Sequence, residues 1–286
     1  MRIGNSVRNQ LLTLLIITAL FTSCDIINPE EEIPAYISID TFILNTVLST
    51  QGPANHNITD AFIQVNGDFV GLYELPCEIP VLDKGEVDLF IKPVIKNNGI
   101  ASSRIAYPFY ENYTATVELN PLEVTKIEPH VKYWNEVIFD WFENFSEQGN
   151  SLDTISGSTV GLEYTNYNGS KAGLIRLPET DDIFRAESIE SFEFPSLSYH
   201  FLYMEMDYIA NQSFTMGMII VTSGNVVVQP IIHINPSDHW NKIYIDLSYY
   251  SQTSNNGQYW VYLEAIKSDD VEEGEIIFDN LKILRF

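Results

Sequence analysis

Two segments of the chain combine aromatic rings with amide side chains, a mixture whose chemistry suits sugar rings. They are residues 164–170, Tyr-Thr-Asn-Tyr-Asn-Gly-Ser, and residues 249–260, which begin with Tyr-Tyr and end with Tyr-Trp. An aromatic face packs on the apolar side of a sugar, while an amide both donates to and accepts from hydroxyl groups. The candidate glycan contacts are Tyr167, Asn168, Tyr249, Tyr250, Asn255, Asn256 and Trp260. The alternative is that these are turn residues beside core aromatics, because aromatic residues make up 13% of the chain.

The elements that must carry these residues are predicted to be strands. Short stretches rich in Val, Ile, Tyr, Phe and Thr recur between turn clusters after residue 33, with no long amphipathic helix among them. Predicted strands include residues 60–65, 69–75 and 191–194, and Asn66-Gly67 predicts a tight hairpin between the first two. The pattern therefore indicates an all-β protein.

The strands divide into two predicted domains. Residues 34–132 hold enough short strands for one small β-sandwich. Residues 136–286 have longer, more amphipathic strands, whose number suits a two-sheet jelly-roll β-sandwich. We place the boundary near residues 132–136.

Sequence motifs of catalysis are missing. The sequence has no G-x-S-x-G nucleophile motif and no glycine-rich phosphate loop, and its five histidines lack zinc-ligand spacing. Paired carboxylates can hydrolyse glycosides, but 39 acidic residues form close pairs by chance. We therefore expect a protein that is not an enzyme, with a glycosidase as the less favoured alternative.

The amino terminus has the order of an export signal. Arg2 and Arg8 precede an almost unbroken apolar run over residues 11–21, which ends at Thr22 and Ser23. This run is roughly half of the 20 apolar residues that a membrane-spanning helix needs. Acidic residues and a proline follow it, a composition that resists compact structure.

Residues 20–24, Leu-Phe-Thr-Ser-Cys, resemble the lipobox of bacterial lipoproteins, although Phe21 stands where that family prefers leucine. The resemblance implies that residues 1–23 are a cleaved signal peptide and that Cys24 carries lipid. Residues 24–33 would then be an acidic tether, and the protein would be anchored in the outer membrane. The sequence leaves open whether the protein faces the periplasm or the cell surface.

Net charge limits the partners. The chain has 15 basic and 39 acidic residues, and a formal net charge of -24. Such a surface repels nucleic acid and anionic lipid over most of its area. We therefore expect no nucleic-acid partner, and we expect membrane attachment through acyl chains rather than a basic patch.

Two further resemblances concern the folded domains. Residues 63–87, with Val-Asn-Gly and a proline-marked strand, look like PEGA-type or carboxypeptidase-regulatory-like domains. With the lipobox and the run Tyr107-Pro108-Phe109-Tyr110, residues 24–130 also resemble the N-terminal part of uncharacterised Bacteroidetes-type surface lipoproteins. Residues 139–143, 240–247 and 277–284 look like galactose-binding-like jelly rolls, the fold of many carbohydrate-binding modules. That likeness implies a structural Ca²⁺ held by Asp279 with Glu143 or Asp140.

Together these patterns predict a non-catalytic lipoprotein that displays a jelly roll for binding glycan or another surface polymer. The alternative is a protein that docks on a surface protein within a cell-surface machine.

Overall fold

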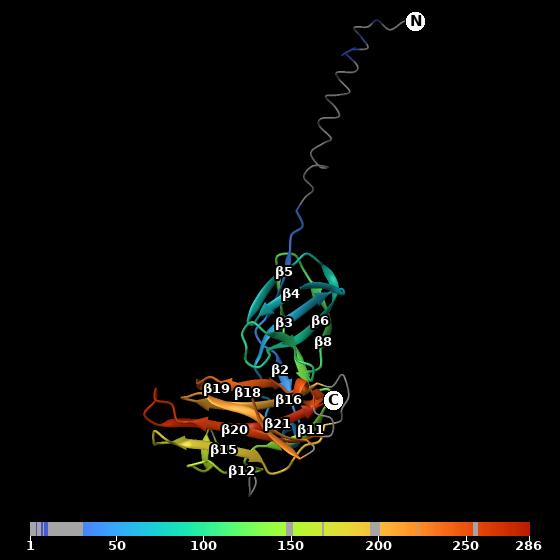
Figure 1. Ribbon diagram of the computed structural model, residues 1–286. Helices are drawn as coiled ribbons and strands as arrows, with labels where there is room; N and C mark the ends of the chain where they lie inside the picture. The colour runs from blue at the N-terminus through green and yellow to red at the C-terminus, as the bar shows by residue number, and fades with distance from the viewer. Residues whose placement is uncertain are drawn as a thin grey trace.

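The computed structural model describes residues 31–146, 151–167, 169–194, 201–222, 224–253 and 257–286, together with Gly4, Val7, Asn9 and Gln10. The fold class is confirmed: the chain is all-β, with a small β-sandwich followed by a jelly-roll β-sandwich (Figure 1). None of the helices within the described ranges has the length and hydropathy needed to cross a membrane.

The small domain packs one sheet against two narrower ones. Strands β4, β3, β6 and β7 form the larger sheet, with β8 also paired to β6, while β5-β1-β9 and β10-β2 form the other layer. The elements are β1 (Ala35–Ile39), β2 (Ile43–Asn45), α3 (Leu48–Gln51), β3 (Ile58–Val65), β4 (Asp68–Glu74), β5 (Cys77–Val81), β6 (Gly85–Lys96), β7 (Arg104–Ala106), β8 (Tyr113–Leu119), β9 (Val124–Ile127) and β10 (His130–Lys132).

The jelly roll has two sheets that face one another. One has the order β13-β14-β21-β16-β19 with β11 paired to β21, and the other has the order β12-β15-β20-β17-β18. The elements are β11 (Ile138–Glu143), β12 (Leu152–Thr154), β13 (Glu163–Tyr167), β14 (Ser170–Leu177), β15 (Ile183–Ser188), β16 (Leu202–Ala210), β17 (Phe214–Thr222), β18 (Asn225–Ile234), β19 (Ser237–Asp246), α4 (Ser248–Thr253), β20 (Gln258–Ile266) and β21 (Gly274–Arg285).

Local sequence explains the best-predicted element. Val65 pairs with Asp68 across the β3–β4 turn, so the loop is Asn66-Gly67 alone. Their φ angles are 52° and 87°, the left-handed values that a two-residue hairpin loop requires and that Asn and Gly tolerate. The predicted hairpin is confirmed.

The predicted strand at residues 191–194 is wrong. Within it, Phe192 forms only an isolated bridge with Tyr259. The strand in this region is β15, whose sequence Ile-Phe-Arg-Ala-Glu-Ser alternates buried and half-buried residues. Its two charged residues conceal that alternation when apolar content alone is scored.

The two domains share a hydrophobic core. The buried cluster of the small domain includes Tyr107 and Phe109, and it also takes in Tyr203, Tyr244 and Leu284 from the jelly roll. The ring centroids of Phe109 and Tyr203 lie 5.7 Å apart in an edge-to-face arrangement. Because apolar surface of both domains is buried in this one cluster, the small domain is fixed against the outer face of the β16–β19–β21 sheet.

Candidate functional site

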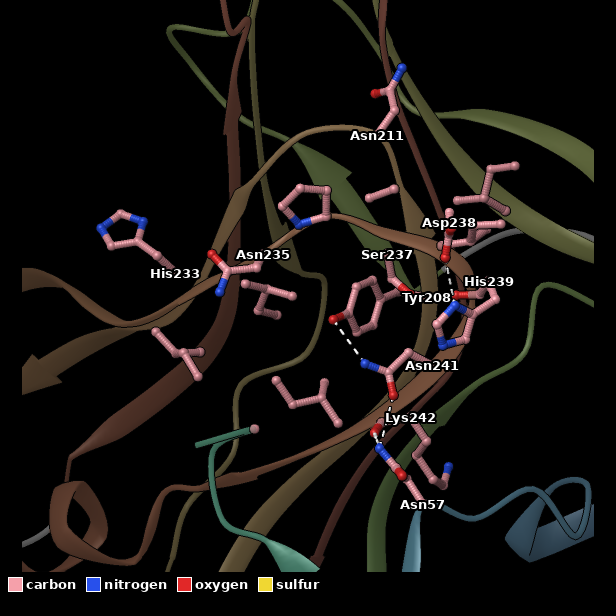
Figure 2. A pocket seen from close by; sticks show the side chains of 18 of the residues that line it. Asn57, Tyr208, Asn211, His233, Asn235, Ser237, Asp238, His239, Asn241 and Lys242 are labelled. Atoms are coloured by element: carbon pink, nitrogen blue, oxygen red, sulfur yellow. Dashed lines mark hydrogen bonds and ion pairs between the residues drawn. The ribbon is translucent and has the colours of Figure 1, made fainter. Parts of the chain in front are cut away.

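A groove of about 1000 Å³ lies where the two domains meet, and we call it the junction groove (Figure 2). The jelly roll supplies most of its wall, from β16, the β18–β19 connection and β19, with Tyr167 at the end of β13. The small domain supplies Asn57 before β3, and Lys96, Asn98 and Gly99 at the end of β6. Residues of both domains therefore line the groove.

Five asparagines stand among the polar residues that line the junction groove. Asn57 Nδ2 donates to Asn241 Oδ1 at 2.8 Å and to the Lys242 carbonyl at 2.9 Å. Asn241 Nδ2 in turn donates to Tyr208 Oη at 3.1 Å. Figure 2 shows this chain at one end of the groove and Asn211 at the other. The five lining asparagines are Asn57, Asn98, Asn211, Asn235 and Asn241.

Tyr167 is the aromatic residue that sequence analysis predicted and that the structure places in the junction groove. Its ring packs edge-to-face on Trp240, with centroids 5.2 Å apart and planes at 83°. Tyr167 lies on β13 and Trp240 on β19, which are the first and the last strands in the order of their sheet. This contact restricts the Tyr167 ring, which lowers the entropic cost of using it as a binding surface.

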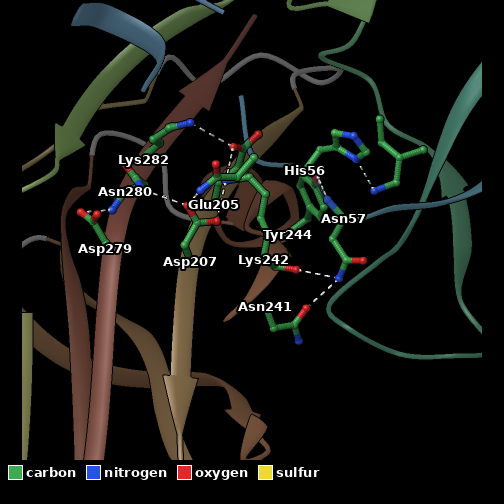
Figure 3. A network of polar contacts seen from close by, with 12 residues as sticks. His56, Asn57, Glu205, Asp207, Asn241, Lys242, Tyr244, Asp279, Asn280 and Lys282 are labelled. Atoms are coloured by element: carbon green, nitrogen blue, oxygen red, sulfur yellow. Dashed lines mark hydrogen bonds and ion pairs between the residues drawn. The ribbon is translucent and has the colours of Figure 1, made fainter. Parts of the chain in front are cut away.

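A buried ionic cluster lies beside the groove at the domain interface (Figure 3). Glu205 is fully buried, and it accepts hydrogen bonds from Tyr107 Oη at 2.8 Å and from Tyr133 Oη at 2.8 Å. Lys242 Nζ lies 3.3 Å and Lys282 Nζ 3.5 Å from the same carboxylate. Two strands of the jelly roll thus bring lysines to a carboxylate that tyrosines of the small domain cover.

The cluster is balanced in charge. Lys242 Nζ also donates to Asp207 Oδ1 at 3.1 Å, so two carboxylates face two ammonium groups. Burial alone would raise the pKa of Glu205, but the charges of Lys242 and Lys282 and the two tyrosine hydrogen bonds outweigh it and lower that pKa. Burial, reinforced by the charge of Lys242, lowers the pKa of Lys282 to about 8.

Asp279 lies on β21 next to this cluster. Its Oδ1 accepts a hydrogen bond from the Asn280 amide at 2.7 Å, and Asn280 Nδ2 donates to Asp207 Oδ2 at 2.9 Å. Burial first, and then the negative charges of Asp207 and Glu143, raise the pKa of Asp279 to about 7.

The residues predicted to hold calcium are engaged with other groups. Glu143 accepts hydrogen bonds from the Phe145 amide and from both the amide and the hydroxyl of Ser151, each at 2.6 Å. Asp140 forms an ion pair with Arg285 at 2.7 Å. Within the described ranges, no three acidic, histidine or cysteine side chains converge closely enough to hold a metal ion. The arrangement does not fit a calcium site built from these three carboxylates, and bound calcium stays a prediction.

The other predicted glycan contacts lie elsewhere. Tyr249 is 69% exposed on α4, and its ring packs against Tyr250, which also contacts the jelly-roll core. Trp260 lies on β20, opposite Ile219 of β17, and it is not among the residues that line the junction groove. Four predicted site residues lie outside the described residues, namely Cys24, Asn168, Asn255 and Asn256.

Sequence reasoning missed Asn57, Asn98 and Asn241. They are single amides far apart in the chain, and only the packing of the two domains brings them together. The one local signal was Lys96-Asn97-Asn98-Gly99 after a predicted strand, which is an ordinary turn composition.

No family model matches the sequence, and no curated protein matches it. Among solved structures, the family 11 carbohydrate-binding module from Clostridium thermocellum, in complex with a β-1,3-1,4-mixed-linked tetrasaccharide, is 14% identical, with 51% of this chain and 95% of that chain covered and a TM-score of 0.38. A family 29 carbohydrate-binding module is also 14% identical, covering 52% of this chain and 89% of that chain at a TM-score of 0.36. At this identity and TM-score, the likeness assigns neither a family nor a ligand to this chain.

Replacing Glu205 with Ala tests the buried cluster. The change leaves Lys242 and Lys282 without their shared carboxylate, and breaking a buried pair in this way costs about 3–5 kcal/mol. We expect the free energy of unfolding, measured by urea denaturation, to fall by that amount. Lys126→Ala, which breaks an exposed pair with Asp40, is the control and should leave stability close to that of the wild type. Equal effects of the two changes would contradict this account of the cluster.

Replacing Asp279 with Asn tests the raised pKa of this carboxyl. The folded chain keeps the proton on Asp279 up to about pH 7, whereas the unfolded carboxyl loses it near its ordinary pKa of about 4. Through this group, stability therefore falls as pH rises from about 4 to about 7. We expect the stability of the variant, relative to the wild type, to increase over that range and to level off above it. A difference that stays constant with pH would contradict the assignment.

Proposed function

We propose that this protein is a non-catalytic, lipid-anchored lipoprotein that binds a glycan in the junction groove. The observation that carries the proposal is the groove itself, about 1000 Å³ in volume and lined by five asparagines and by Tyr167. Known small-ligand pockets span about 300–1000 Å³, so the groove has room for several sugar units.

The lining chemistry suits sugars. Sugar hydroxyls need donors and acceptors at close spacing, and an asparagine amide supplies both from one short side chain. The apolar face of a sugar ring packs well on an aromatic ring, which Tyr167 supplies. Because Asn57 and Asn98 come from the small domain, that domain is part of the binding site and not merely a spacer.

A second candidate function, docking on a partner protein, is favoured by the edge strand β18. Its consecutive valines Val226, Val227 and Val228 are 67%, 49% and 48% exposed. An exposed apolar edge strand is a common place for a partner strand to pair. We rank this function second because the groove offers more specific polar contacts.

Replacing Tyr167 with Ala tests the glycan site. Loss of the ring should weaken binding to glycans that the wild type recognises on an array by about tenfold or more, because a buried aromatic contact contributes over 1 kcal/mol. The matched control is Tyr249→Ala, which removes an exposed tyrosine outside the groove and should leave affinity unchanged. The proposed site fails if Tyr167→Ala has no effect and Tyr249→Ala does.

Replacing Cys24 with Ala tests the anchor. An acyl chain attached at Cys24 would hold the protein in the membrane fraction, since each buried methylene contributes about 0.8 kcal/mol. We expect the variant to lose the lipid mass seen by mass spectrometry and to leave the membrane fraction. Cys77→Ala removes the other cysteine and should keep both properties. Membrane association that survives Cys24→Ala would overturn the proposed anchor.

A further inference from the structure

The end of the small domain at which the chain enters carries exposed apolar side chains on three neighbouring strand ends. Ile33 is 54% exposed before β1, Leu82 is 57% exposed after β5, and Leu122 is 72% exposed in the turn before β9. In Figure 1 this end of the small domain lies away from the jelly roll. We call these three residues the entry tip.

Backbone pairing brings the three positions of the entry tip together. Strand β1 lies between β5 and β9 in their sheet. Ala35 at the start of β1 is paired with Val81 at the end of β5, next to Leu82. On the other side, the Leu122 amide donates to the Pro34 carbonyl at 2.9 Å. Singly exposed apolar residues are ordinary on a protein surface, whereas apolar residues at three adjoining strand ends depart from that pattern.

Leu122 stands at a position that the backbone does not favour for leucine. The Glu123 amide donates to the Asn120 carbonyl at 3.1 Å, which closes a four-residue turn with Pro121 at its second position. Leu122, at the third position, has a φ of 68°. Proline followed by a left-handed residue is the pattern of a type II turn, in which glycine or asparagine usually takes the third position. A bulky residue is strained there, and Leu122 gains little burial in return.

A lipid bilayer is the partner that this arrangement fits. Ile33 follows Cys24 by nine residues, and a fully extended chain spans at most about 3.6 Å per residue, so an acylated Cys24 keeps the entry tip within about 30 Å of the membrane. Side chains on three separate strand ends can enter a fluid bilayer one by one, as the apolar residues of interfacial segments do. A folded protein partner would instead need a surface shaped to all three.

We infer that the entry tip inserts its three apolar side chains into the headgroup region of the bilayer that anchors the protein. This inference rests on the proposed lipid anchor and deepens it, because it gives the anchored protein an orientation. With the entry tip on the membrane, the small domain stands between the bilayer and the jelly roll (Figure 1). The jelly roll is then presented away from the lipid surface.

Charges at the same end select the kind of lipid. Among the exposed charged residues there, Glu31, Glu32, Asp83 and Glu123 are acidic and Lys84 is basic. Together with the net charge of -24, this excess of carboxylates repels anionic headgroups. The entry tip therefore suits a zwitterionic lipid surface, which it contacts through apolar side chains rather than through charge.

The experiment places the lipidated two-domain protein in phosphatidylcholine vesicles and measures fluorescence from a single labelled cysteine. Cys77→Ala removes the other cysteine, and Leu122→Cys then carries the label. Vesicles of ordinary lipid are compared with vesicles of the same lipid brominated on its acyl chains, which quenches a label that reaches the bilayer. We expect bromination to remove about half of the emission at residue 122 or more, because the side chain lies in the interface. Ile189→Cys, on the jelly roll and 58% exposed, is the matched control and should keep its emission.

A second variant separates lipid contact from a role in folding. Leu122→Asn removes the apolar side chain and supplies a residue that tolerates the left-handed backbone. With the label moved to Leu82→Cys, this change should reduce quenching by brominated lipid, while the urea midpoint stays at or above that of the chain with Leu122. Partial replacement of phosphatidylcholine by phosphatidylglycerol should also reduce the quenching, and stronger quenching would contradict the choice of a zwitterionic surface.

The outcomes separate this inference from the anchor on which it rests. Protein that carries lipid at Cys24 and floats with vesicles, but shows equal quenching at residues 122 and 189, overturns the membrane contact and keeps the anchor. A chain without lipid that does not float with vesicles overturns both. Emission at residue 122 that falls with the protein-to-lipid ratio, and not with bromination, indicates a second copy at the entry tip and overturns the inference. Should Leu122→Cys fail to fold, the label at Leu82→Cys gives the same comparison.

Discussion

The buried carboxylate of Glu205 is the interaction on which the arrangement of the two domains depends. A carboxylate without solvent contact is very costly unless charges and hydrogen bonds replace its water. Here Lys242 and Lys282 of the jelly roll supply the charges. Tyr107 of the small domain and Tyr133, which directly follows its last strand, supply the hydrogen bonds. Because neither domain alone supplies both the lysines and the tyrosines, these groups surround Glu205 only when the two domains are correctly placed relative to each other.

Apolar packing buries surface at this interface, and polar groups fix the relative orientation of the two domains. The aromatic contacts around Tyr107, Phe109 and Tyr203 bury surface without demanding one orientation. Hydrogen bonds such as that from the Asn57 amide to Tyr244 Oη, at 3.0 Å, accept only a narrow range of geometries. The junction groove inherits this rigidity, because its walls are the margins of the interface.

Sequence reasoning predicted the fold class and one groove residue, and it failed where burial came from outside the sheet. On β16, Tyr203-Met204-Glu205-Met206-Asp207 alternates in the manner of a strand with one solvated face, which places Glu205 in water. In the structure, seven consecutive residues from Leu202 are buried, since the small domain covers the outer face. The aromatic and amide pattern found Tyr167, but the lining asparagines converge only through tertiary packing.

The edge strand β18 limits how the molecule associates with itself. Its exposed valines are the kind of sequence that adds strand to strand into aggregates. Pro230, in the middle of the strand, has no amide hydrogen, and its carbonyl already accepts a bond from Gln229 Nε2 at 2.8 Å. A strand that paired along this edge would lose a hydrogen bond at Pro230, so the proline opposes extension of the sheet past this residue.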